Sequence, residues 1–158
     1  MKVFIKSIII ILLFSNFCYS QGSSPMKTVK DLFVAMENND SSLAAKVFTE
    51  DAMLFTVMGE ESEEILRKTP ATNLIAAFGT PKDDLWQEPI WDEEVRIEDN
   101  LASVWVKYAF YLNGKLSHCG VDAFHLVRIK NQWKIFHLAD TRKTDCTIPG
   151  DIIKQFQK

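Results

Sequence analysis

The residues with the clearest chemical potential lie between positions 101 and 146, a stretch that reads as three long strands joined by tight turns. Asp122 could act as a general base, because burial beside an aromatic ring would raise its pKa. His118 or Tyr111 could then polarise an oxygen atom of the substrate. Asp122 and His118 are therefore the candidate catalytic residues.

Asp122 also has a purely structural interpretation, which we favour. A buried carboxylate could pair with a neighbouring cation and stabilise the curl of the sheet, and the candidate partners are Lys107, His118 and Arg142. Asp140 and Arg142 lie two residues apart on a strand and therefore share a face. They could recognise a carboxylate or phosphate group, or they could pair with their neighbours.

The sequence gives little support to metal binding or nucleophilic catalysis. The plausible metal ligands are His118, His125, His137 and Asp122, but no three of them have the spacing of a zinc site. The chain has neither a Gly-x-Ser-x-Gly motif nor a Cys-x-x-Cys pair. We predict no metal and no other cofactor, and we favour binding over catalysis.

Asn113-Gly114 predicts a two-residue β-hairpin turn, since both positions of such a turn need a positive φ. With this turn, Trp105 is expected opposite Asp122. Because side chains alternate between the faces of a sheet, one face should collect the pocket residues, which are Ser103, Trp105, Lys107, Tyr111, His118, Asp122 and Phe124. The other face is nearly all apolar and carries Tyr108, Cys119 and His125.

The register of the last strand stays open. A two-residue loop at Lys130-Asn131 would add to the face of Asp122 the residues Trp133, Ile135 and His137. A three-residue loop would instead add Phe136, Leu138, Asp140 and Arg142. Whether Arg142 reaches the pocket therefore depends on one residue of loop length.

Two tryptophans, Trp86 and Trp91, precede these strands. They could form an aromatic wall for a flat ligand, although such residues more often fill the space between a sheet and a helix.

Three helices are predicted before the long strands. Ser24-Pro25 opens the first helix with a hydroxyl cap and a proline at its first position. Residues 40–42 cap the second helix, and Thr69-Pro70 opens the third, which Gly79 ends. Residues 53–58 read as a buried strand and residues 65–68 as a weaker one. This order of helices and strands indicates the α+β class.

The first 20 residues have the pattern of a cleaved secretory signal. Lys2 and Lys6 precede an apolar run at residues 8–14, and small side chains lie just before Gln21. The run is shorter than the roughly 20 residues that a membrane span needs. We expect residues 21–158 to form a single domain that is exported to the periplasm or secreted, without a stable membrane anchor.

The charge of the remaining chain disfavours nucleic acid as a partner. Two of the 18 basic residues and none of the 21 acidic residues lie in the signal, so residues 21–158 carry a formal charge of −5. Nucleic-acid binding needs clustered Lys and Arg to neutralise phosphates. An anionic membrane surface is disfavoured for the same reason.

Two cysteines remain outside the signal, Cys119 and Cys146. Export would place them where disulfides persist, and we favour a bridge between them over two separate buried thiols. The bridge would pin the tail of the chain to the central strand.

Several of these segments resemble an exported bacterial branch of the nuclear transport factor 2-like superfamily, which is grouped with SnoaL-like and lumazine-binding-like proteins. The resemblance is carried by residues 118–124, the strand at 133–135, residues 140–142 and Cys146. It implies a cone-shaped, curved antiparallel sheet wrapped around about three N-terminal helices, with a pocket inside and dimerisation through the sheet. The catalytic residues of enzymes in this superfamily do not match the chain one by one, so no catalytic role carries over.

Three functional hypotheses follow. The favoured one is an exported small-molecule-binding protein whose pocket is lined by Trp86, Trp91, Trp105, Tyr111, His118, Asp122 and Arg142. The second is a small lyase or isomerase that uses Asp122 with His118. The third is a domain that dimerises without using its pocket.

Overall fold

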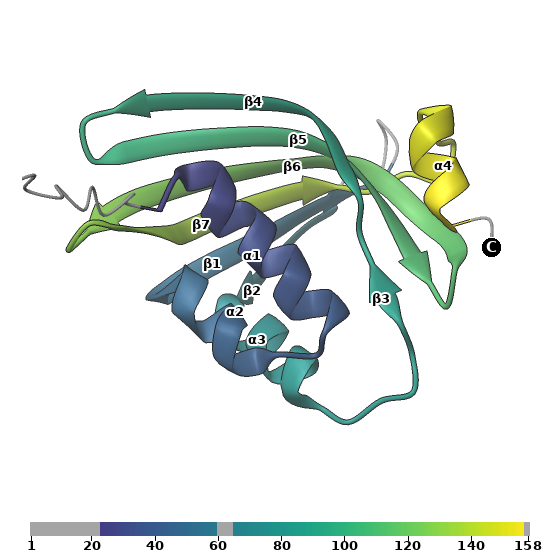
Figure 1. Ribbon diagram of the computed structural model, residues 1–158, viewed down its shortest axis with the longest axis horizontal. Coiled ribbons are helices and arrows are strands. Elements are labelled where there is room, and N and C mark those ends of the chain that lie inside the picture. The colour runs from purple at the N-terminus through teal and green to yellow at the C-terminus, as the bar shows by residue number, and fades with distance from the viewer. Residues whose placement is uncertain (1–22, 60–64, 157–158) are drawn as a thin grey trace, which may run out of the picture.

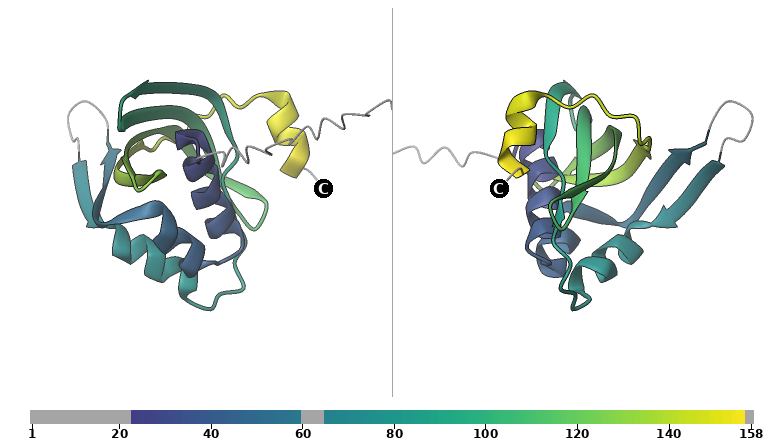
Figure 2. Two further views of the ribbon diagram at one scale, coloured as in Figure 1. Left: turned by 60° about the vertical axis from the view of Figure 1, so that its left-hand side comes forward. Right: turned by 90° about the vertical axis from the view of Figure 1, so that its right-hand side faces the viewer.

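The computed structural model describes residues 23–59 and 65–156 (Figure 1). The expected signal peptide lies outside the described residues. Three helices, α1 (Pro25–Glu37), α2 (Ser41–Val47) and α3 (Ala71–Gly79), pack inside a strongly curved sheet of seven strands (Figures 1 and 2). The predicted α+β fold, a cone-shaped sheet wrapped around N-terminal helices, is confirmed.

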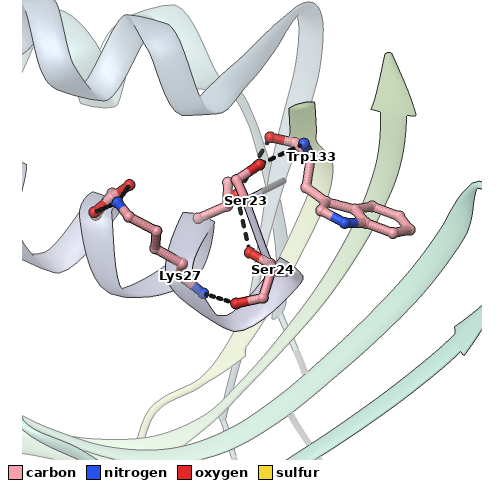
Figure 3. A network of polar contacts seen from close by, with 6 residues as sticks. Ser23, Ser24, Lys27 and Trp133 are labelled. Atoms are coloured by element: carbon pink, nitrogen blue, oxygen red, sulfur yellow. Dashed lines mark hydrogen bonds and ion pairs between the residues drawn. The ribbon is translucent and has the colours of Figure 1, made fainter. Parts of the chain in front are cut away.

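The start of α1 is tied to the sheet by polar contacts (Figure 3). The Ser24 side chain accepts a hydrogen bond from the backbone N–H of Lys27 at 3.1 Å, as expected of a helix cap. The Ser23 hydroxyl accepts a hydrogen bond from the backbone N–H of Trp133, and Thr28 donates its hydroxyl hydrogen to the carbonyl oxygen of the same residue. These bonds fix α1 against the last strand.

The other two helices begin close to their predicted starts. The Asp40 carboxylate caps α2 by accepting from the N–H of Leu43 at 2.9 Å. Helix α3 begins at Ala71, because Pro70 is still the last residue of a strand and forms the helix cap without a side-chain bond. The prediction that Thr69 caps this helix is therefore wrong.

The sheet consists of β1 (Phe48–Met58), β2 (Ile65–Pro70), β3 (Trp86–Gln87), β4 (Ile90–Glu98), β5 (Leu101–Leu112), β6 (Lys115–Ile129) and β7 (Gln132–Thr141). The strand order is β2-β1-β7-β6-β5, and β3 and β4 both pair with β5. All pairs are antiparallel except β1 with β7, which run parallel, so the sheet is mixed. The described residues end in a fourth helix, α4 (Gly150–Phe156), which the sequence did not predict.

The face of the sheet toward α1, α2 and α3, here called the inner face, forms the main core. Its fully buried side chains include Val104, Val106, Phe124, Leu126 and Ile135. A second, smaller cluster lies on the opposite, outer face and consists of Ala109, Tyr111 and Cys119, with Trp91, Cys146 and Ile148 packed against them. The two faces therefore bury different parts of the same strands.

The predicted register of the hairpin between β5 and β6 holds only next to the turn. Leu112 pairs with Lys115 as expected, but Ser117 is an extra residue, and from His118 onward every pairing shifts by one. Asp122 consequently pairs with Val106, and Trp105 pairs with Ala123. The prediction that Trp105 and Asp122 share a face is wrong.

This bulge reassigns the two faces. His118, Asp122 and Phe124 lie on the inner face, whereas the other members of the predicted pocket face lie on the outer face, namely Ser103, Trp105, Lys107 and Tyr111. The side chain of Trp105 is 50% exposed. A bulge inserts one residue into one strand and so reverses the alternation beyond it.

The last strand contains a second bulge. The loop before β7 has two residues, Lys130 and Asn131, both with positive φ. Trp133 and Ile135 are buried in the main core. Phe136 is then an extra residue, so Leu138, Asp140 and Arg142 also face inward. The two-residue alternative is thus correct for the first half of the strand and the three-residue alternative for the second half. Phe136 and His137, each expected inside by one alternative, lie on the outer face.

The predicted disulfide between Cys119 and Cys146 is confirmed. Their Cα atoms lie 5.9 Å apart, and the bridge closes a sequence separation of 27 residues on the outer face. It holds the segment that leads to α4 against β6. None of the helices within residues 23–59 and 65–156 is both long enough and apolar enough to cross a membrane.

Candidate functional site

A cavity of about 100 Å³ lies inside the cone, between the helices and the inner face of the sheet. Its apolar wall comes from α1, α3 and the sheet, and consists of Leu32, Phe33, Met36, Leu54, Leu74, Phe78 and Leu138. Its polar wall comes from the sheet and the segment between β3 and β4, and consists of Thr56, Glu88, Tyr108, His118, Asp122, Asp140 and Arg142. An apolar body with a few convergent polar groups is typical of a small-molecule site.

Two carboxyl groups meet in this cavity. Glu88 lies between β3 and β4, where Gln87 pairs with Tyr111 and the carbonyl oxygen of Pro89 accepts from the N–H of Ala109. This pairing holds the segment against β5, and the Glu88 side chain shares a hydrogen bond with that of Asp122. The Asp122 residue is only 3% exposed.

Burial is the main cause of the unusual acidity of this pair. It raises the pKa of Glu88 to about 8, an effect that Asp140 strengthens and that Asp122 and Arg142 partly oppose. Burial likewise raises the pKa of Asp122 well above its usual value, with further contributions from the charges of Glu88 and Asp140. The pair therefore holds at least one proton at pH 7 and titrates as a unit.

Asp140 is the third carboxylate of the site, and it is fully paired. The Thr56 hydroxyl donates to one of its oxygens at 2.6 Å, and Nε of Arg142 donates to the other at 2.7 Å. The Asp140 side chain is 12% exposed and the Arg142 side chain 43%, so the ion pair extends from the cavity toward solvent. These two bonds fix Arg142 at the edge of the cavity.

Tyr108 and His118 complete the polar wall. The Tyr108 hydroxyl donates to the carbonyl oxygen of Thr141 at 2.9 Å, and burial raises the pKa of this phenol. The His118 ring packs against Phe110, with ring centroids 5.1 Å apart. Burial and the charge of Arg142 lower the pKa of His118, so the imidazole is neutral at pH 7.

The structure brings together only part of the predicted site. Asp122, His118 and Arg142 line the cavity, and Asp140 joins them. Trp86 packs in the core against Phe78 and Phe110, with Nζ of Lys82 3.5 Å from its ring centroid. The remaining predicted residues, Trp91, Trp105 and Tyr111, lie on the outer face. The bulge at Ser117 separates Trp105 and Tyr111 from the face of Asp122, whereas Trp91 shares the outer face with Lys107, its partner on β5.

Three residues of the polar wall were not predicted from the sequence. Tyr108 was assigned to the apolar face through the incorrect register, and Thr56 was counted only as part of a buried strand. Glu88 was passed over between the two tryptophans. The available signal was a single acid within the sequence Trp-Gln-Glu-Pro-Ile-Trp. Aromatic residues tend to be buried, and burying a carboxylate among them costs free energy, so such an acid is a candidate for a functional role.

The polar wall of the cavity carries no net positive charge. Asp140 and Arg142 neutralise each other, and the pair of Glu88 and Asp122 carries no charge or a single negative charge at pH 7. The pair can donate and accept hydrogen bonds, and it can exchange a proton. In the part of the chain that the structure describes, no group of three or more His, Cys, Asp or Glu residues could hold a metal ion.

No family model matches this sequence, and no curated protein matches it at a significant level. Solved structures do match. An NTF2-like protein from Cytophaga hutchinsonii is 19% identical, with a TM-score of 0.57, and the match covers 75% of this chain and 94% of that one. A protein from Novosphingobium aromaticivorans assigned as a scytalone dehydratase is 14% identical, with a TM-score of 0.57 and coverage of 78% and 86%.

A second protein from Novosphingobium aromaticivorans, assigned as the β subunit of an aromatic-ring-hydroxylating dioxygenase, is 7% identical, with a TM-score of 0.62 and coverage of 80% and 92%. At these identities the likeness concerns the fold alone. The fold is that of the nuclear transport factor 2-like proteins, as the sequence resemblance implied.

Proposed function

We propose that this nuclear transport factor 2-like domain binds a small molecule inside the cone, against the carboxyl pair of Glu88 and Asp122. The observation that carries the proposal is the pair itself. Placing the half-buried Glu88 carboxyl group against the buried Asp122 carboxyl group costs folding free energy, and such perturbed groups cluster at functional sites. The guanidinium of Arg142, which could have neutralised them, donates to Asp140 instead.

The cavity limits the size and charge of the ligand. Its volume of about 100 Å³ is below the roughly 300 Å³ at which pockets for drug-sized ligands begin, and an engineered apolar cavity of about 150 Å³ suffices for benzene. The ligand is therefore small, or it displaces α1 and α3 when it enters. The charge of the site favours a neutral or cationic molecule with O–H or N–H donors.

Two features support a location outside the cytoplasm. The first 20 residues have the pattern of a secretory signal, and the Cys119–Cys146 bridge is of the kind that persists in oxidising compartments. We infer that the domain is exported and meets its ligand there. Sequencing the N-terminus of the protein recovered from the periplasm or medium tests this, and a chain that still begins at Met1 would contradict it.

A proton-transferring lyase or isomerase is the second candidate. The specific observation in its favour is the pKa of about 8 at Glu88, because a general acid or base works best when its pKa lies near the working pH. Neutral His118 lies in the same cavity and could polarise a carbonyl oxygen. In this case the pair removes a proton from the substrate and returns it elsewhere.

One experiment separates binding from catalysis. Native mass spectrometry of the purified protein identifies molecules that co-purify, and a thermal-shift screen of small neutral, cationic and anionic compounds supplies further candidates. Asp122→Asn keeps the shape of the site, so a binding protein should lose about tenfold in affinity or less. A general base should lose roughly 10²–10⁴-fold in activity.

Asp51→Asn, at an exposed position of β1, is the matched control and should change neither quantity. If no compound binds the unmodified protein and none co-purifies with it, the proposed binding function is wrong.

Pairing of two copies through the sheet stays a prediction. It is supported by large apolar side chains exposed on the strands, among them Leu101, Trp105 and Phe136. Light scattering coupled to size-exclusion chromatography should give twice the chain mass, and Trp105→Lys should reduce it to the mass of one chain. A single-chain mass for the unmodified protein would contradict the prediction.

A further inference from the structure

Two histidines face each other on the outer face of the sheet, outside the cavity described above. His125 on β6 pairs directly with His137 on β7, immediately before the bulge at Phe136. Their Nδ1 atoms lie 3.1 Å apart, and their ring centroids 5.1 Å apart. One proton held between two Nδ1 atoms is the simplest state of such a pair.

We propose that His125 and His137 bind one divalent transition-metal ion through their Nδ1 atoms. Two nitrogens 3.1 Å apart that each bind an ion at about 2.0–2.1 Å subtend an angle of roughly 95–102° at that ion. This value lies between the angles of square-planar and tetrahedral coordination. The spacing of the two nitrogens therefore suits a shared ion as well as a shared proton.

Aromatic neighbours hold both imidazole rings in place. Phe55 packs against His137 with ring centroids 5.0 Å apart, and Phe136 stacks on His125 at 6.1 Å. Because the rings are already positioned, binding an ion requires little further ordering of side chains. His125 is exposed in the single chain, so ions in solution can reach the pair there.

A third residue favours copper among the possible ions. Met53 pairs with His137 across β1 and β7. It lies on the outer face, since its neighbours Ala52 and Leu54 face the core and the cavity. Thioether sulfur selects copper(I) and occurs as a weak axial ligand of copper(II), and copper(II) tops the affinity order of divalent ions for imidazole. We assign Met53 as an additional ligand for copper, with water in the remaining positions.

The chain offers a matched control, because its third histidine, His118, lies on the inner face of the same strand. Tag-free protein is titrated with Cu²⁺ and with Zn²⁺ by calorimetry, and the Cu²⁺ complex is examined by electron paramagnetic resonance. We expect one ion per chain and hyperfine coupling to two nitrogen nuclei. His125→Gln and His137→Gln should each weaken binding by about tenfold or more and leave one coupled nitrogen, while His118→Gln keeps the original affinity.

His125→Gln is the decisive variant, because it alters an exposed side chain and should leave the near-ultraviolet circular dichroism unchanged. Unaltered Cu²⁺ and Zn²⁺ affinity in this variant, loss of binding in His118→Gln, or no binding to the unmodified protein at about 1 mM metal would each overturn the proposal. Met53→Leu should weaken Cu²⁺ binding and leave Zn²⁺ binding unaltered. Unaltered Cu²⁺ affinity would remove Met53 from the ligand set.

Discussion

The side chains of Glu88 and Asp122 are hydrogen-bonded to each other, although the two residues lie on opposite sides of β5. Glu88 lies in the segment between β3 and β4, which pair with one edge of that strand, and Asp122 lies on β6 along its other edge. Asp122 is buried and Glu88 is half-buried, and loss of solvation raises the pKa of each carboxyl group. The folded protein therefore binds protons that the unfolded chain releases, which links stability to pH.

This linkage predicts that the protein becomes less stable as the pH rises from about 4.5 to about 8. Glu88 has a pKa of about 8 in the folded state against 4.5 as its ordinary value. The stabilisation from its proton is fully present below pH 4.5 and is lost as the pH rises through 8. Between these limits we expect the free energy of unfolding to fall by roughly 1–3 kcal/mol less in Glu88→Gln than in the unmodified protein.

Urea denaturation of both proteins at a series of pH values measures this difference. Asp51→Asn serves as the control, because it removes an exposed carboxyl group and should leave the slope against pH unaltered. Parallel pH profiles for the unmodified protein and Glu88→Gln would show that Glu88 is charged in the folded state at neutral pH.

Gly120 is predicted to tolerate no side chain. A Cβ atom at this position would lie 1.9 Å from the carbonyl oxygen of Thr141, which also accepts the hydrogen bond of Tyr108. Gly120→Ala must therefore push β7 away from β6 and disturb that bond, and we expect a loss on the order of 2–4 kcal/mol in the free energy of unfolding. Thermal and urea denaturation measure it.

Gly150→Ala is the matched control, since no atom lies within 4 Å of a Cβ atom there. It should change stability by less than about 1 kcal/mol. Similar losses for the two variants would contradict the close approach at Gly120.

The sequence predicted the elements of this fold well but assigned several side chains to the wrong face. Helix caps, strand alternation and the Asn113-Gly114 turn are local signals, and the helix at Ser24, the long hairpin and the Cys119–Cys146 bridge agree with them. The alternation rule, however, assumes uninterrupted pairing. Nothing in the local sequence at Ser117 marks an extra residue, so the rule failed beyond it.

The candidate site was predicted in part for the same reason. Asp122 and His118 lie on one strand on the same side of the bulge, so their common face did not depend on the register with β5. Glu88 reaches the cavity from a segment between two strands, where no periodicity applies. Its position follows from how β3 and β4 share the edge of β5, which is a property of the assembled sheet.

Reduction of the disulfide is predicted to destabilise the protein and to release the tail. The bridge closes a loop of 27 residues, for which the chain-entropy model gives about 3–4 kcal/mol. Cys119 is 4% exposed and packs with Ala109 and Tyr111, so Cys119→Ala also loses part of that packing, whereas Cys146→Ser mainly removes the bridge. We expect hydrogen exchange to rise in α4 in the Cys146→Ser variant, while α1 stays protected.

Denaturation with and without reductant compares the two states directly. If the unmodified protein is equally stable under both conditions, and alkylation shows that the bridge was indeed reduced, the bridge contributes nothing to the folded state.

We predict that the stability of the fold depends on the presence of a residue at position 117 and not on the side chain of Ser117. It is exposed, and its hydroxyl oxygen lies 3.1 Å from Nδ1 of His118. Ser117→Ala should therefore change the free energy of unfolding by less than about 0.5 kcal/mol. Deleting Ser117 removes the bulge, so either the Asn113-Gly114 turn must change its geometry or Asp122 and Phe124 must move to the outer face.

Because moving Phe124 out of the core is the more costly outcome, the turn should yield, and we expect the deletion to cost about 2 kcal/mol or more. Denaturation of the two variants measures the contrast. Heteronuclear NMR of the deletion variant should show altered signals at residues 111–117 and nearly unchanged signals at Phe124. A deletion no more harmful than Ser117→Ala would mean that the hairpin pairs without the extra residue, as the turn alone predicts.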